Sequence, residues 1–193
     1  MLSERQEEII EKSICLIAEK GIQGFTIKNL SKAIGISEPA IYRHFKSKTE
    51  ILLTILDNFK QMANMLSDMM MKNNMPAIEK IAFMFNRMVD MFTETPAIVS
   101  VIFSEEIFKN ETVLKDKIVE ILNKNEETIE QILKTGQKNK EIRTDISEET
   151  LALMVMGSLR LLVKRWDLNN YKSNLKSDGK NIILGLQKIL NNN

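Results

Sequence analysis

The 193-residue sequence contains only one cysteine and one histidine, and both scarcities exclude kinds of chemistry. A single cysteine cannot build a disulfide framework, so the sequence predicts a protein of a reducing, cytoplasmic compartment. One histidine and one cysteine without a close acidic cluster do not make a ligand set for zinc, so neither a metal site nor a cofactor is expected. The motifs G-x-S-x-G and G-K-[ST] are missing as well. No catalytic residue is therefore predicted, and an enzyme is disfavoured.

Long hydrophobic runs are also missing. No apolar stretch approaches the about 18 residues that a membrane-spanning helix needs, and residues 1–12 are charged where a secretion signal would be apolar. Hydrophobic residues make up 44% of the chain, charged residues make up 27%, and the net charge is only +1. This balance excludes a protein that is basic over its whole surface, and it predicts a soluble protein without a membrane partner.

Glycine and proline are scarce, since seven glycines and three prolines interrupt the whole chain. Apolar residues recur every three or four positions instead of alternating, which is typical of helices. Thr26, Ser37 and Ser47 are predicted N-caps, and Glu50 would complete a capping box with Ser47. We predict an all-α fold of about nine helices, over residues 3–20, 27–34, 37–45, 48–72, 77–92, 97–103, 112–139, 148–166 and 175–190.

Positive charge is concentrated in one short region of the chain. Residues 28–48 contain five cations and one acid, a net charge of +4, whereas residues 105–150 carry a net charge of −4. Two short helices joined by a turn at Gly35 have the layout of a helix-turn-helix. An excess of cations on such helices is typical of a contact with double-stranded DNA.

The segment "FTIKNLSKAIGISEPAIYRHFKSKTEIL" (residues 25–52) resembles the DNA-binding signature of the TetR family of transcriptional regulators. The G-I-S turn, the Y-R-H-F end of the third helix and the K-S-K-x-E-I-L start of the fourth all match in order, and residues 9–21 fit the first helix. Beyond about 60 residues only helix count and order match. The resemblance implies a DNA-binding domain over residues 1–47 (helix-turn-helix at about 25–45), a connector helix over 48–72, and an effector-binding and dimerisation domain over 73–193.

The third helix would enter a major groove, with its first turn at the base edges and flanking residues at the phosphates. Two members of this set have an alternative role: Glu38 would only complement the helix dipole, and Tyr42 would be a half-buried core residue. The residues expected to contact DNA are Thr26, Lys28, Ser37, Glu38, Pro39, Ala40, Tyr42, Arg43, His44, Lys46 and Lys48.

The last two helices carry apolar stripes that suit a helix-on-helix interface. The resemblance implies that they pair with their copies in a four-helix bundle, so that a homodimer presents two recognition helices to a palindromic operator. The alternative is that both stripes pack within the monomer. The predicted dimer interface consists of Leu151, Val155, Leu159, Leu162, Ile182, Ile183, Leu186, Ile189 and Leu190.

Twelve methionines are many for a chain of this length, and methionine-lined surfaces adapt to varied apolar ligands. We expect a hydrophobic effector pocket within the helical second part, with ordinary core packing as the alternative. The residues expected to line it are Phe85, Met88, Phe92, Phe103, Phe108, Met154 and Trp166.

Together these patterns predict a cytoplasmic, nucleoid-associated repressor that a small apolar effector releases from its operator. The long helix over residues 48–72 would transmit the signal. The alternative is a DNA-binding organiser that needs no effector, because "GISEPAIYRHF" is similar to the head of the nucleoid occlusion factor, a TetR relative. That second similarity is expected to end with the head.

Overall fold

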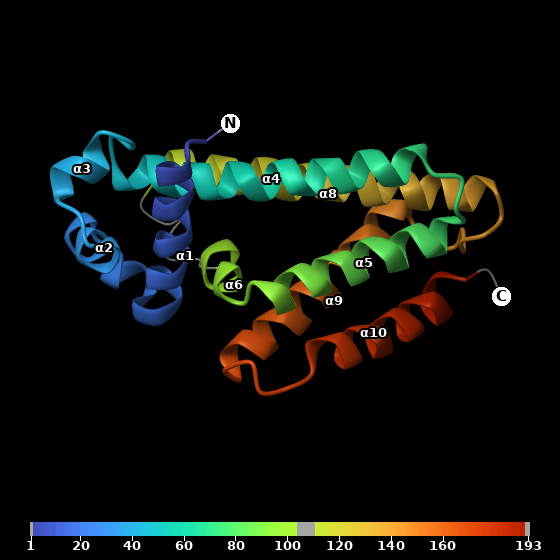
Figure 1. The fold of residues 1–193 in the computed structure, drawn as a ribbon. Helices are drawn as coiled ribbons and strands as arrows, with labels where there is room; N and C mark the ends of the chain where they lie inside the picture. The colour runs from blue at the N-terminus through green and yellow to red at the C-terminus, as the bar shows by residue number, and fades with distance from the viewer. Residues whose placement is uncertain (1, 104–110, 192–193) are drawn as a thin grey trace. The chain divides into compact units, whose positions relative to one another are not determined.

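The structure is a computed structural model, and it describes residues 2–103 and 111–191. Over these residues the chain forms nine α-helices and no strand, which confirms the all-α prediction (Figure 1). None of these helices has the length and apolarity needed to cross a membrane. The helices are α1 (Glu4–Gly24), α2 (Ile27–Ile34), α3 (Glu38–Tyr42), α4 (Lys48–Lys72), α5 (Ala77–Glu94), α6 (Ala97–Ile102), α8 (Thr112–Lys138), α9 (Glu148–Leu168) and α10 (Leu175–Leu190).

Local signals explain most helix starts. The hydroxyl of Thr26 accepts a hydrogen bond from the backbone N–H of Asn29, and Ser147 caps α9 in the same way through Thr150. At α4, Ser47 accepts from the N–H of Glu50 at 3.1 Å. The Glu50 carboxylate accepts from the N–H of Lys46 instead of Ser47, so only half of the predicted capping box forms.

Two glycines set the bends around α2. Gly21 has a φ of +66°, a left-handed value that interrupts α1 before its last three residues. Gly35 has a φ of +79° and ends α2 as predicted. The helix α3 ends at Tyr42 and is therefore shorter than the predicted 37–45, and Ser37 precedes it without a side-chain cap bond.

The chain packs as two compact units. The first unit comprises the described residues of Met1–Gln61 and Ala97–Val119, and the second comprises those of Met62–Pro96 and Glu120–Asn193. The expected boundaries at residues 47 and 73 divide the chain by function, whereas these units divide it by packing. Both α4 and α8 therefore begin in the first unit and end in the second.

The first unit is built around α1, which packs against α2 and α6. Its core is formed by apolar side chains from α1, α2, α3, the start of α4 and α6, and it includes Ile9, Ile17, Leu30, Ile41, Ile55 and Val99. Their burial supplies the hydrophobic stabilisation that holds two helices as short as α2 and α3 in place.

In the second unit, α10 packs against α5 and α9 (Figure 1). The approach of α10 to α5 is close at Gly179, where an added Cβ would lie 3.1 Å from a methyl of Val89. The second half of α4 also has a defined buried face. Ala63 and Met70 are buried, whereas Met62 and Met69 are exposed, because steps of seven residues from Leu56 stay on one helix face.

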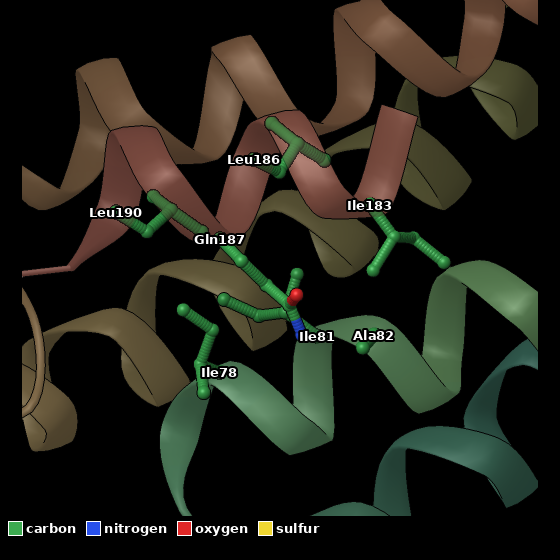
Figure 2. A pocket seen from close by; sticks show the side chains of 7 residues that line it. All are labelled: Ile78, Ile81, Ala82, Ile183, Leu186, Gln187 and Leu190. Carbon is green, nitrogen blue, oxygen red and sulfur yellow. The ribbon is translucent and has the colours of Figure 1, made fainter. Parts of the chain in front are cut away.

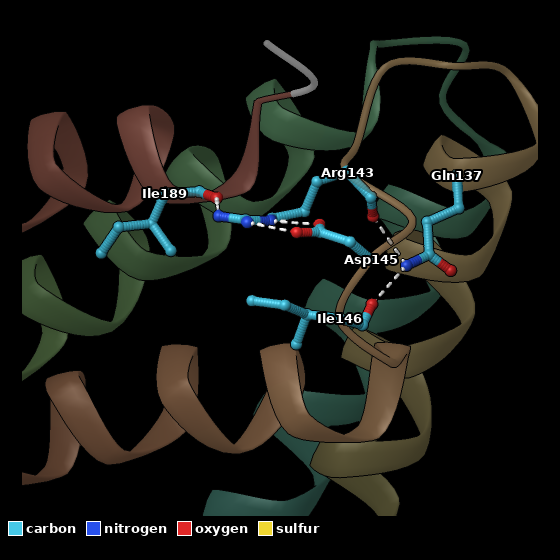
Figure 3. A network of polar contacts seen from close by, with 5 residues as sticks. All are labelled: Gln137, Arg143, Asp145, Ile146 and Ile189. Atoms are coloured by element: carbon cyan, nitrogen blue, oxygen red, sulfur yellow. Dashed lines mark hydrogen bonds and ion pairs between the residues drawn. The ribbon is translucent and has the colours of Figure 1, made fainter.

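A polar network fixes the connection between α8 and α9 to the end of α10 (Figure 3). The guanidinium of Arg143 donates two hydrogen bonds to the Asp145 carboxylate, at 2.7 and 2.6 Å, and a third to the carbonyl of Ile189 at 3.2 Å. The amide of Gln137 donates to the carbonyls of Arg143 and Ile146. Since cations favour helix C-termini, Arg143 complements the end of α10.

Candidate functional site

Most of the residues predicted to contact DNA are exposed on α2, α3 and the turns around them. Tyr42 is 50% exposed, so it is not a core residue. Ala40, His44 and Lys48 are half-buried. The exposed members of the set are Thr26, Lys28, Ser37, Glu38, Pro39, Tyr42, Arg43 and Lys46.

A small cluster of buried apolar side chains holds this surface in place. Leu30 on α2 and Ile41 on α3 have no exposed area, and Phe45 after α3 is nearly as buried. The turn between the helices is closed by the backbone N–H groups of Gly35 and Ile36, which both donate to the carbonyl of Ser31. The two short helices are therefore fixed to each other, and their polar side chains point outward from a rigid base.

The cations on this surface are available to an external anion. Over the residues that the structure describes, Lys28, Lys32, Arg43 and Lys46 form no ion pair. Glu38 in the first turn of α3 is the one acid of the segment from 28 to 48. A net positive, solvent-exposed surface of this kind attracts a polyanion without first breaking internal ion pairs.

Lys48 differs from these four cations. Its ammonium donates a hydrogen bond to the carbonyl of Ile22 at 3.2 Å and lies 5.2 Å from the centre of the Phe25 ring. Burial lowers the pKa of Lys48, and the negative charge of Glu111 opposes this shift in part. The ammonium of Lys48 therefore has partners within the first unit, the carbonyl of Ile22 and the ring of Phe25.

The predicted dimer interface divides into buried and accessible residues. Leu151, Val155, Ile183, Leu186 and Leu190 are buried within the single chain, where α9 and α10 pack in the second unit. These five side chains fill the monomer core, which is the alternative that the sequence left open. Leu159, Leu162 and Ile182 are half-buried, and Ile189 is exposed.

A different apolar face of α9 and α10 is open to solvent, and it was not predicted from the sequence. On α9, Leu153, Leu161 and Leu168 are 65%, 63% and 69% exposed, and Leu184 on α10 is 57% exposed. Gly157 and Gly185 lie among them, and an added Cβ at either would meet no atom within 4 Å. The signal was the spacing of 153, 157, 161 and 168, which places all four on one helix face.

The second unit also contains a small apolar cavity between α5 and α10 (Figure 2). Gln187 supplies its one polar side chain, which points toward Ile81. The lining residues are Ile78, Ile81, Ala82, Ile183, Leu186, Gln187 and Leu190.

None of the predicted pocket residues lines this cavity. Phe85 and Phe92 are buried on α5, Met88 is half-buried, and Met154 is 40% exposed. Trp166 is buried, and its ring N–H donates to the carbonyl of Ser173 at 3.0 Å. Phe103 belongs to the first unit, and Phe108 lies outside the described residues.

No cluster of three or more His, Cys, Asp or Glu side chains suited to a metal ion occurs in the described part of the chain.

Comparison with known proteins extends the resemblance to the whole chain. Residues 9–55 match the family described as bacterial regulatory proteins, tetR family, and residues 56–187 match the YsiA-like protein C-terminal region. The fatty acid metabolism regulator protein of Bacillus subtilis is 25% identical over 171 residues, which cover 87% of this chain and 86% of that protein. The nucleoid occlusion factor SlmA of Vibrio campbellii is 22% identical over 170 residues, with 87% and 86% covered. The expectation that this second similarity ends with the head is therefore wrong.

The fold agrees with these matches. The crystal structure of the transcriptional regulator FadR from Bacillus subtilis, in complex with stearoyl-CoA, superposes with a TM-score of 0.81 at 22% identity and covers 97% of this chain and 99% of that one. The fatty acid metabolism regulator protein and FadR are both regulators by name. The chain belongs to the TetR family of bacterial regulatory proteins and is a helix-turn-helix, DNA-binding transcriptional regulator.

Proposed function

We propose that this regulator is a cytoplasmic homodimeric repressor that binds a palindromic operator and is released from it by an apolar effector. The observation that carries the DNA-binding part is a group of exposed cations on α2 and in the turn after α3 that form no ion pair over the described residues. The buried cluster of Leu30, Ile41 and Phe45 fixes this group. The functional division proposed is a DNA-binding domain over residues 1–47, a connector over 48–72, and an effector-binding and dimerisation domain over 73–193.

In the DNA complex, the first turn of α3 meets base edges and the surrounding residues meet phosphates. Ser37, Glu38, Pro39 and Ala40 form that first turn, and the methyl group of Ala40 suits contact with a thymine methyl. The phosphate-binding side chains are those of Thr26, Lys28, Tyr42, Arg43, His44 and Lys46. The N-terminus of α2 adds backbone N–H groups that favour an anion.

The dimer forms through the open apolar face of α9 and α10. Leu153, Leu161, Leu168 and Leu184 supply the apolar area, and Ile189 lies at its edge. Gly157 and Gly185 allow the backbones of two helices to approach closely, because they have no side chain between them and the partner. A twofold axis through this face repeats the recognition helix on each side, which is what a palindromic operator requires.

The effector that we propose is a molecule with a long apolar chain, such as an acyl-CoA. The observation that supports this class is that the similar FadR structure contains stearoyl-CoA. The cavity between α5 and α10 has an aliphatic lining but is too small, as it stands, for such a chain. A ligand that favours the conformation with lower DNA affinity weakens operator binding by its differential affinity for the two states.

The test measures binding of the purified protein to fragments of its own promoter region as salt is varied. Lys46→Ala should weaken binding to all fragments and reduce the slope of log affinity against log salt by about one. Lys138→Ala, at the end of α8, is the matched control and should change neither quantity. No mobility shift at low salt, or an unchanged slope in Lys46→Ala, would refute the proposed interface.

The effector is tested by adding stearoyl-CoA, with coenzyme A alone as the control for its polar part. Release of the operator by stearoyl-CoA and not by coenzyme A is expected. If neither changes binding, the effector class is wrong while the DNA-binding proposal remains.

One alternative has specific support, because the similarity to the nucleoid occlusion factor SlmA covers most of both chains. In that case the protein organises DNA at many sites without an effector. Genome-wide binding separates the two functions: one or a few promoter sites favour a repressor, and many dispersed sites favour an organiser.

A further inference from the structure

Gln6, in the first turn of α1, uses both ends of its side-chain amide. The backbone N–H of Ser3 donates to the Gln6 carbonyl oxygen Oε1 at 3.0 Å, and the backbone N–H of Gln6 donates to the Ser3 hydroxyl at 3.3 Å. These two bonds form the capping box of α1. The amide nitrogen Nε2 of Gln6 donates instead to the backbone carbonyl of His44, at 3.3 Å. Gln6 therefore joins the start of α1 to the turn after α3, 38 residues later in the chain.

The contact with His44 explains why this position carries glutamine. The capping box alone needs only an acceptor here, which glutamate supplies together with a charge that the helix dipole favours. A carboxylate, however, offers no donor to the His44 carbonyl, and a lysine offers no acceptor to Ser3. A flipped amide would set its NH2 group against the N–H of Ser3 and its oxygen against a carbonyl, so both contacts require the same orientation. The two contacts together therefore need a side chain that accepts and donates at once.

The turn after α3 is anchored from two sides. On one side, Gln6 of α1 donates to the carbonyl of His44. On the other side, the Glu50 carboxylate of α4 accepts from the backbone N–H of Lys46. The backbone that carries the exposed cations Arg43 and Lys46 is therefore held to α1 and to α4 by separate hydrogen bonds.

We propose that Gln6 is a positioning residue for DNA binding, which places the turn that carries Arg43 and Lys46 by holding the carbonyl of His44. This inference rests on the proposed DNA-binding function and gives the start of α1 a role that was not predicted from the sequence. The positions of the phosphates are fixed by the duplex. Because hydrogen bonds weaken steeply with distance and angle, a displaced turn loses several charge-assisted contacts with the phosphates at once.

The experiment compares Gln6→Glu with Ser3→Asp in the full chain. Glutamate keeps the acceptor of the capping box and loses the donor to His44. Aspartate is as good an N-cap as serine and adds the same charge at the same helix end, while Gln6 stays intact. Gln6→Glu should bind the promoter fragment about tenfold more weakly than Ser3→Asp, because a carboxylate would face the His44 carbonyl. Its urea midpoint should stay close to that of the wild type, since the helix dipole offsets the lost bond.

Hydrogen exchange without DNA measures the order of the turn itself. The backbone N–H groups of residues 44–46 are all hydrogen bonded, to the carbonyl of Ile41 or to the carboxylate of Glu50. Their exchange rates therefore report local opening of the turn. Gln6→Glu should accelerate exchange at these three amides and leave α9 and α10 unchanged, whereas Ser3→Asp should accelerate none of them.

A double variant separates positioning from a direct contact between the Gln6 amide and DNA. If Gln6 acts by placing the turn, its substitution costs less affinity once Lys46 has been replaced by alanine. The free-energy loss in Gln6→Glu combined with Lys46→Ala should thus be smaller than the sum of the two single losses. Ser3→Asp combined with Lys46→Ala is the control for the added charge and should be additive.

Three outcomes would each overturn the positioning role and leave the DNA-binding proposal intact. These are additive losses in the double variant with Gln6→Glu, unchanged exchange at residues 44–46, and a loss of affinity matched by an equal loss of stability. A wild-type protein that binds no DNA at low salt would instead overturn the proposed function, and the positioning role with it.

Discussion

Individual residues matter most where three segments meet in the second unit. Gly136 on α8 faces both Ala77 and Ile142, and an added Cβ would lie 2.5 Å from a carbon of each. Next to it, the N–H of Ala77 donates to the Glu141 carboxylate at 2.6 Å, which caps the start of α5 from a different segment. No other residue type fits at position 136 without a shift of the backbone around it.

Gly136→Ala is therefore expected to destabilise the protein by about 1–3 kcal/mol, as overpacking of a filled site does. Urea denaturation followed by circular dichroism measures the difference. Thr135→Ala is the control, because Thr135 is the exposed neighbour on the same helix and alanine is the stronger helix former. A neutral Gly136→Ala would contradict the close packing, and a concentration-dependent midpoint would separate dimer effects from those within the monomer.

The sequence could not distinguish Lys48 from Lys46, although it placed both at the start of a helix. The two lysines have the same chemistry and the same local signals. They differ because Ile22 and Phe25, more than 20 positions earlier, lie beside only one of them. The need for glycine at position 136 was hidden for the same reason, since Ala77 and Ile142 belong to other segments.

At the scale of elements, the helices were predictable where their signals are local. Thr26, Gly35 and Ser147 act on the helix beside them, so the bounds of α2 and the start of α9 were predicted correctly. The inward faces of α9 and α10 were not predictable. Both helices carry apolar residues around more than half of their circumference, and packing against α5 decides which half is buried.

The ion pair of Arg143 and Asp145 at the end of α10 predicts how the stability of the protein depends on pH. The hydrogen bond from Arg143 lowers the pKa of Asp145 below its ordinary value of 3.8. A carboxylate with a depressed pKa contributes stability above its ordinary pKa, and that contribution is lost as the pH falls through the lower folded value. Asp145→Asn should thus destabilise the protein at pH 6 and make little difference near pH 2.

Urea midpoints at the two pH values measure this change, and Asp116→Asn on α8 is the control, because its carboxylate forms no ion pair over the described residues. Equal destabilisation by Asp145→Asn at both pH values would mean that the side chain of Asp145 stabilises the protein by packing and not by its charge.

For the whole molecule, the proposed dimer depends on the open face of α9 and α10. Leu161→Glu places a charge in the proposed interface and should yield a monomer at micromolar concentration, because an unpaired charge is costly to bury. Size-exclusion chromatography with light scattering measures the mass, and operator affinity should fall together with the dimer. Met65→Glu on α4 is the matched control, since Met65 is 69% exposed and lies outside α9 and α10. A dimeric Leu161→Glu would exclude this face.

The family and the all-α class were predictable because the helix-turn-helix signature is contiguous in sequence. The composition of the first unit was not, because α6 packs against α1 from a position about 80 residues later in the chain. The apolar residues of α6 show that it is buried, but their pattern does not identify the helix that covers them.

Because the first unit is made of two separate stretches of chain, its N-terminal stretch cannot be exchanged alone between relatives. An expression fragment that stops at the end of α4 would lose α6 and leave part of the apolar surface of α1 uncovered. A chimaera that borrows its operator specificity from a relative must therefore carry over residues 97–119 together with the first 61, or re-engineer the surfaces at which the two pieces join.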